Sequence, residues 1–202
     1  MIKPMKCFVG LLVTVLLPLA AAAQEFSADT VTHDSRSAET PRGKVYRGAT
    51  MIRAEGLSGP QGTSGTFLIV DVAKQAGYLI SPSRKMILVT HGKSAFLGLR
   101  IVLPVGETPC TLPGEPPAAN VSCRKLNDET VNGRQAVKWE IHDTARGRNI
   151  SEYVWVDSHL NTIIKLQGQG TSIEVQNIQE GAQPASLFEL PPGYQQMEAG
   201  GR

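Results

Sequence analysis

The chain has 202 residues, 41% of them hydrophobic, and a formal net charge of +2 at pH 7. Two lysines within the first 23 residues account for that excess, so the remainder carries equal numbers of basic and acidic side chains. A neutral domain offers no electrostatic attraction to a polyanion, which argues against nucleic acid as a partner. The length is that of one domain with a substantial core.

Residues 1–23 have the composition of a secretory signal peptide. A short start with two lysines precedes an apolar run over residues 8–23, which ends in three alanines before Gln24. This run is shorter than the ~20 residues needed to span a bilayer, and no basic cluster follows it. The pattern predicts cleavage after Ala23, export of the protein, and no transmembrane segment in the mature chain.

Two cysteines, Cys110 and Cys123, remain after cleavage. An even number of cysteines in an exported chain favours a disulfide. The alternative is a metal-binding or redox pair, but the spacing is far from C-x-x-C and no histidine lies within the intervening loop or close to it. We therefore expect a structural disulfide, which the chain-entropy model values at roughly 3 kcal/mol.

The first half of the mature chain predicts short strands between turns. Residues 26–31 begin either an edge strand or a short helix, and the sequence leaves both open. The next expected elements are strands over 43–47 and 50–54, a glycine-rich loop over 55–65, strands over 66–72, 78–80 and 85–90, a short helix over 92–100, and a proline-rich disulfide loop over 106–119.

The second half predicts a meander of strands. Residues 122–131 and 134–142 flank Asn132-Gly133, which is the strongest short hairpin signal. Further strands are expected over 150–156, 162–167 and 171–178, with short connections between them. The sequence thus predicts a mainly β fold, built as a single curved antiparallel sheet with little helix.

The two halves differ in how their apolar residues alternate. Val137, Trp139 and Ile141 alternate with polar neighbours, which is typical of a sheet with one dry face and one wet face. The strands over 67–70 and 86–89 are apolar at both odd and even positions, so other parts of the protein must cover both of their faces. Either the N-terminal segment, residues 92–100 and the disulfide loop complete a filled core, or part of the apolar face lines a ligand cavity.

The chain carries no motif of a known catalytic or cofactor site. It lacks the serine-hydrolase elbow, the H-E-x-x-H pair, the P-loop and the dinucleotide fingerprint. The four histidines are scattered near the ends of expected strands, where solvated loop histidines are the usual case. We therefore predict no enzyme activity, no metal and no cofactor. Trp139, Tyr153 and Trp155 form either an aromatic binding patch or cross-strand core pairs, and alternating strand positions favour the core.

Several segments together resemble a known group of exported proteins. They read, in order, FSADTV, GKVYRGATMIRAE, YLISPSRKMILV, CRKLNDETVNGRQAVKWEI, EYVWVDSHLNTIIKL and IEVQNIQEGAQPASLFELPPGYQQM. From about Phe26 to Met197 the chain resembles bacterial proteins of the outer-membrane lipoprotein-sorting (LolA/LolB-like) superfamily. The resemblance implies a periplasmic protein with an unclosed antiparallel half-barrel, whose apolar concave face is usually covered by helices.

In the carrier members of that superfamily, the concave face shields the acyl chains of lipoproteins that cross the periplasm. Such chains need shelter because each buried methylene is worth about 0.8 kcal/mol. The resemblance therefore implies a domain over residues 24–197 that binds lipid or lipoprotein acyl chains, followed by a flexible tail over 198–202. Apolar positions of the first-half strands are the expected lining: Phe67, Ile69, Leu79, Met86 and Leu88.

Two other functions remain open from the sequence. A filled interior would favour a module that binds other envelope proteins through a sheet edge or the disulfide loop. An enzyme is the third possibility, and the absence of a catalytic motif makes it the weakest. No position of this chain matches a specific functional residue of the carriers. The strand parity that faces the concavity is also undetermined.

Overall fold

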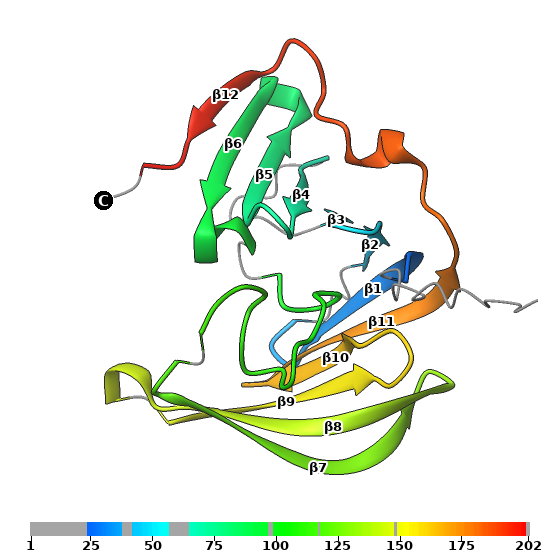
Figure 1. The fold of residues 1–202 in the computed structure, drawn as a ribbon, viewed down its shortest axis with the longest axis vertical. Helices are drawn as coiled ribbons and strands as arrows, with labels where there is room; N and C mark the ends of the chain where they lie inside the picture. The colour runs from blue at the N-terminus through cyan, green and yellow to red at the C-terminus, as the bar shows by residue number, and fades with distance from the viewer. Residues whose placement is uncertain are drawn as a thin grey trace, which may run out of the picture.

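Twelve strands form one sheet in a computed structural model of the protein (Figure 1). The described residues are 24–37, 42–56, 65–96, 99–116, 118–147 and 149–200, so the predicted signal peptide lies outside them. The strand order is β12-β6-β5-β4-β3-β2-β1-β11-β10-β9-β8-β7, and every neighbouring pair is antiparallel except β12 with β6. The two edges do not meet, which confirms the predicted mainly β, unclosed sheet.

The strands in chain order are β1 (Phe26–Asp34), β2 (Arg42–Arg47), β3 (Met51–Glu55), β4 (Phe67–Asp71), β5 (Ala76–Ser81), β6 (Met86–His91), β7 (Val121–Val131), β8 (Arg134–Asp143), β9 (Ile150–Asp157), β10 (Thr162–Gly168), β11 (Thr171–Glu180) and β12 (Gln195–Glu198). The helices are 3₁₀ turns: η1 (Pro82–Arg84), η2 (Gly92–Phe96), η3 (Ala145–Gly147) and η4 (Ala185–Phe188). Among the described residues no helix exceeds five residues or is long enough to cross a membrane.

Tight turns set the register of the second half. Asn132 and Gly133 both have positive φ, 49° and 81°, as the two-residue turn between β7 and β8 requires. Gln169 and Gly170 repeat this conformation between β10 and β11, with φ of 51° and 81°. The predicted hairpin and meander are therefore confirmed, because local turn chemistry alone brings these strands side by side.

β1 occupies the centre of the sheet rather than an edge. It pairs with β2 on one side and with β11 on the other, so it joins the two halves of the chain. The sequence left this segment open between an edge strand and a short helix. Its place depends on the pairing with β11, which lies more than 130 residues further along the chain, and no local pattern reports such a contact.

The concave face of the sheet is covered by the chain that follows β6. Figure 1 shows the strands β7 to β10 curving around the segment after η2. Phe96 and Leu103 of this segment are buried in one core cluster with Ile52 and Leu68 of the concave face. The first-half strands thus receive their inner cover from a 3₁₀ turn and an extended segment.

The convex face of the first half is covered by the C-terminal segment, residues 181–194. Leu190 and Tyr194 pack against a second cluster of buried residues, which includes Ile69 and Ile80. The chain then adds β12 beside β6 as a parallel edge strand (Figure 1). Both faces of the first-half strands are therefore covered, which explains why these strands are apolar on both parities.

The predicted tail, residues 198–202, begins inside β12. Glu198 is the last residue of that strand, and the backbone N–H of Ala199 donates to the carbonyl of Val89 at 2.8 Å. The parallel pairing between β12 and β6 was not expected from the sequence. It arises because the segment after β11 crosses the convex face of the first half before it reaches the sheet edge at β6.

A buried carboxylate closes the turn between β9 and β10. Asp157 is 1% exposed and accepts hydrogen bonds from the guanidinium of Arg134 and from the backbone N–H groups of His159 and Leu160, at 2.9 and 2.8 Å. Burial raises the pKa of Asp157, but these hydrogen bonds outweigh that effect and hold the pKa below its usual value of 3.8. Arg134 also pairs with Glu180 at 2.8 Å, so this cluster links β8, β9 and β11.

Candidate functional site

A cavity of about 420 Å³ lies between the segment after η2 and the concave face of the second half. One wall consists of sheet residues from β7 to β10: Val121, Ile141, Asp143, Ile150, Glu152 and Ile163. The other wall consists of residues that follow β6: Lys93, Phe96, Leu99, Arg100, Leu103, Pro104, Val105, Pro109, Cys110, Thr111 and Leu112. Most of these side chains are apolar, so the cavity suits an apolar ligand.

Alternation along the strands places the apolar floor on one face. Ile141 pairs with Glu152, and Val156 pairs with Ile163, so these side chains all point toward the concavity. Ile141 and Ile163 are 4% exposed and pack in a cluster with Val105. The floor is therefore part of a packed core.

Hydrogen bonds hold the opposite wall onto the start of β10. The Thr162 hydroxyl donates to the Leu103 carbonyl at 2.7 Å, and the Asn161 amide donates to the Val105 carbonyl at 2.6 Å. The backbone N–H of Val102 donates to the Ile163 carbonyl at 3.0 Å. Residues 102–105, which have no regular secondary structure, are thus held by hydrogen bonds to their own backbone groups. These bonds also give partners to carbonyls that would otherwise be buried without one.

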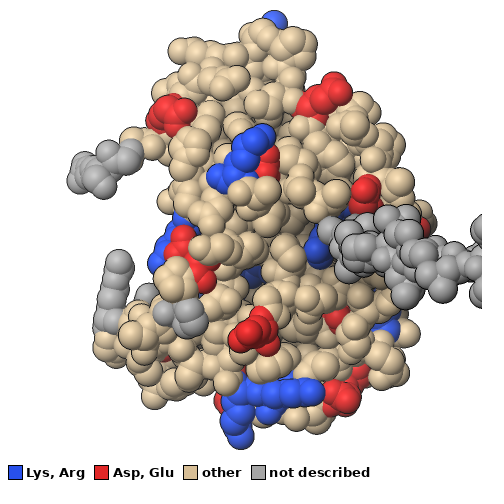
Figure 2. All heavy atoms as spheres, in the orientation of Figure 1, with Lys and Arg blue, Asp and Glu red and all other residues tan. Residues whose placement is uncertain are grey.

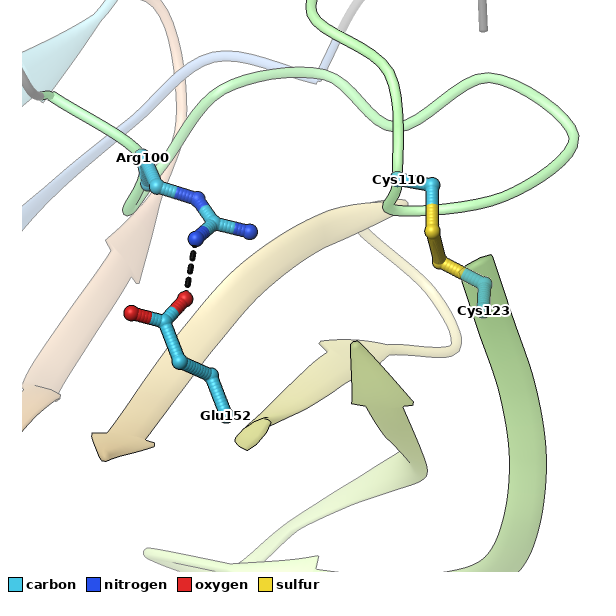
Figure 3. The surroundings of a disulfide bond; sticks show 4 residues. All are labelled: Arg100, Cys110, Cys123 and Glu152. Atoms are coloured by element: carbon cyan, nitrogen blue, oxygen red, sulfur yellow. Dashed lines mark hydrogen bonds and ion pairs between the residues drawn. A yellow bond between two sulfur atoms is a disulfide. The ribbon is translucent and has the colours of Figure 1, made fainter. Parts of the chain in front are cut away.

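The predicted disulfide joins this wall to the edge of the sheet. Cys110 and Cys123 are bonded, with Cα atoms 5.8 Å apart, and Cys123 lies in β7 (Figure 3). Cys110 lines the cavity itself, so the bond ties the wall directly to the sheet. A structural disulfide is typical of an exported protein.

Charged side chains lie at the rim of the cavity. Arg100 forms an ion pair with Glu152, and the two side chains are 33% and 27% exposed (Figure 3). Lys93 lies 3.2 Å from Glu115 in a second ion pair. Figure 2 shows acidic and basic side chains scattered over this face of the molecule without a large patch of one sign. An apolar floor below a charged rim is the arrangement that an amphiphile requires.

The described residues hold no cluster of three or more His, Cys, Asp or Glu side chains that could bind a metal ion. The ring of His142 meets the Ser151 hydroxyl at 3.2 Å on the exposed surface, outside the cavity lining. His91 and His159 lie beside Glu198 and Glu180 in exposed pairs. None of these contacts places a base and a nucleophile in the cavity.

The strand register divides the five predicted lining residues between the two faces. Phe67 and Ile69 lie on the convex face, beneath the C-terminal segment. Leu79 and Leu88 are direct cross-strand partners on the concave face, and Met86 shares their parity. The cavity described above is lined by other residues, from the second half and the segment after η2.

The cavity-lining residues were not singled out from the sequence. The proline-rich segment carries no periodic pattern, so its approach to the concave face is decided by tertiary packing. Only the predicted disulfide gave a signal, since it constrains Cys110 to lie near the strand that contains Cys123.

The aromatic residues of the second half separate onto opposite faces. Trp139 packs beside the cluster of Ile141, Ile163 and Val105 and pairs with Val154, whereas Trp155, 3% exposed, follows Val154 in β9 and so points to the other face. The Lys138 ammonium lies 4.9 Å from the Trp155 ring and 5.1 Å from the Tyr153 ring, between two aromatic faces. The indole N–H of Trp155 donates to Glu129 at 2.6 Å, which, with an amide hydrogen bond, lowers the pKa of that carboxyl. These rings are held by structural contacts, as expected for core positions.

No protein-family model matches the chain, and no curated protein sequence matches it. Solved structures do match. The chain is structurally similar to LolA superfamily proteins. A LolA superfamily protein from Nitrosomonas europaea matches with a TM-score of 0.37 and 11% identity, over 83% of this chain and 91% of its own.

Two further structures are similar to this chain. A DUF1329 family protein from Desulfovibrio piger matches with a TM-score of 0.41 and 12% identity, over 84% of this chain and 91% of its own. PNGF-II matches with a TM-score of 0.53 and 8% identity, over 87% of this chain. The match spans only 31% of PNGF-II. At these identities the likeness concerns the fold alone.

Proposed function

We propose that this protein is a non-enzymatic periplasmic binding protein that shelters an acyl chain of a lipid or lipoprotein. The observation that carries the proposal is the cavity of about 420 Å³, with its apolar floor and charged rim. Its volume falls within the range of small-molecule sites, roughly 300–1,000 Å³. The acyl chain would lie on the floor near Ile141 and Ile163, and the polar head would face the rim.

The sequence resemblance to the lipoprotein-sorting superfamily supports the same role. In the proposed complex the wall formed by residues 99–112 takes the place of the helical cover found in the carriers. Leu79, Met86 and Leu88 are further candidates, because they lie on the concave face at the far side of the sheet. Phe67 and Ile69 would not contact the ligand, because they lie on the convex face, where the C-terminal segment packs.

A bulky substitution in the cavity tests the proposal. Ile150 is half-buried in β9 and lines the cavity, whereas the next residue, Ser151, points to the opposite face and is exposed. Ile150→Trp should fill the site, and Ser151→Trp is the matched control. Each variant would be purified from the periplasm of its own host and examined for bound lipid by native mass spectrometry.

We expect lipid on the wild-type protein and on Ser151→Trp, and little or none on Ile150→Trp. Titration with N-phenyl-1-naphthylamine, a neutral apolar dye, should give the same order, with affinity at least tenfold weaker for Ile150→Trp. Thermal unfolding of each variant verifies that the fold survives. Equal lipid loading of the two folded variants would refute the proposed site.

The filled concavity of the first half favours a second candidate, an interaction module for other envelope proteins. Ala95 and Phe96 are buried there against the sheet, which leaves less room for a ligand. Met197 of β12 is 44% exposed, so an apolar side chain is presented on the strand at the edge of the sheet. This candidate predicts that the wild-type protein carries no lipid, so the same experiment separates the two functions.

A further inference from the structure

One buried arginine lies on the concave face without a partner. Arg47 is the last residue of β2 and is 7% exposed. Its neighbours across the sheet are Phe26 in β1 and Ile52 in β3, which share its face. Phe26 and Ile52 belong to the main core cluster, together with Val45 of the same strand. The Arg47 side chain therefore starts from an apolar part of the concave face, and it is almost fully buried there.

No described residue gives the Arg47 side chain a hydrogen bond or an ion pair, and its Nη1 atom is buried without a partner. The contrast with Arg53 on the neighbouring strand is informative. Arg53 faces the convex side, where it contacts Glu55 at 2.7 Å and the Leu187 carbonyl at 3.0 Å. Burial lowers the pKa of Arg47, yet an arginine side chain stays protonated in proteins.

An arginine is almost never buried unless it is paired, because an uncompensated charge loses its hydration without gaining a partner. We propose that Arg47 binds the anionic head group, a carboxylate or a phosphate, of a single-chain amphiphile. This inference rests on the proposed function and adds the chemistry of the ligand. The apolar surroundings require the anion to be attached to an apolar chain, since a hydrophilic anion alone would lose its own hydration there.

One core cluster connects the cavity wall with the neighbours of Arg47. Leu99 and Leu103 line the cavity, and they belong to the same cluster as Phe26 and Ile52, the cross-strand neighbours of Arg47; Arg47 itself is not part of the cavity lining. Arg47 in β2 and Ile163 in β10 are three strand spacings apart, about 14 Å across the sheet. A head group at Arg47 and an acyl chain in the cavity would therefore both lie on the concave face, within the reach of one single-chain amphiphile.

The test compares three twelve-carbon probes that differ in their head groups: dodecanoate, dodecyl phosphate and dodecanol. Dissociation constants would be measured by calorimetry at pH 8 for the wild-type protein, Arg47→Met and Arg53→Met. Arg47→Met removes the charge with little loss of volume. Arg53→Met is the matched control, since it removes a charge from the adjacent strand on the opposite face.

We expect the wild-type protein to bind at least one anionic probe tenfold or more tightly than dodecanol, because hydrogen bonds to charged groups are the stronger kind. Whether dodecanoate or dodecyl phosphate binds more tightly identifies the head group. In Arg47→Met this preference should disappear while the affinity for dodecanol stays within threefold. Arg53→Met should keep the wild-type preference.

Arg47→Met should unfold at or above the wild-type temperature, because no partner of Arg47 loses a bond. Should that variant fail to fold, Arg47→Gln provides the neutral side chain. A wild-type protein that binds dodecanol as tightly as both anions overturns the inference and leaves the acyl-chain function standing. Binding of none of the three probes overturns both. A preference that persists without the charge at residue 47 also overturns the inference.

Discussion

Removal of the disulfide should weaken both the fold and the cavity. Cys110 and Cys123 are 13 residues apart in sequence, and the chain-entropy model values a bridge over such a loop at roughly 3 kcal/mol. For a domain of this size, each kcal/mol shifts the unfolding temperature by about 2–4 °C. The variant with serine at both positions should therefore unfold at a temperature about 6–12 °C lower.

The same variant should bind ligand less tightly, since Cys110 lines the cavity and the bond ties that wall to β7. Thermal unfolding followed by circular dichroism measures the first effect, and dye titration well below the unfolding transition measures the second. Dithiothreitol should reproduce both effects in the wild-type protein and change neither in the double-serine variant. An unfolding temperature within 2 °C of the wild type, or an unchanged affinity, would refute this account of the disulfide.

Two further predictions concern the packing around the sheet. Asp157→Asn should lower the free energy of unfolding by about 2–4 kcal/mol, because it breaks a largely buried pair with Arg134. Since the folded state lowers the pKa of Asp157, its contribution to stability is present above the unfolded pKa of 3.8 and is lost as the pH falls through the folded value. The free energy of unfolding should therefore depend less steeply on pH below pH 4 in Asp157→Asn than in the wild type. Equal slopes for the two proteins would contradict this. Gly77→Ala should lower the free energy of unfolding, measured in urea, by about 1–3 kcal/mol. The reason is that the Cβ of the new alanine would lie 2.0 Å from the Ala95 carbonyl oxygen. Gly106→Ala, with open space around it, should be nearly neutral, and equal losses for the two would refute this explanation.

Much of the second half of the fold could be predicted from the sequence because its information is local. The Asn132-Gly133 turn sets one hairpin, and alternation over 134–142 identifies the buried face. The disulfide followed from counting cysteines in a chain that the sequence predicts to be exported. Each of these features depends on residues that are near one another in sequence.

The cavity and the unpaired arginine could not be predicted in this way. The wall over 99–112 has no periodicity, and only its hydrogen bonds to β10 reveal where it lies. Arg47 occupies a strand position like any other in the sequence. Its burial becomes visible only when Phe26 and Ile52 are seen beside it.

By itself, the sequence determined that this protein is a sheet of short strands with a disulfide, and that its first-half strands need cover on both faces. Only the tertiary structure decided which segments supply that cover: residues 92–96 and 99–105 on the concave face and residues 181–194 on the convex face. The reason is physical. Strand alternation and turns are set by neighbouring residues, whereas the choice among apolar segments to cover a face depends on long-range packing.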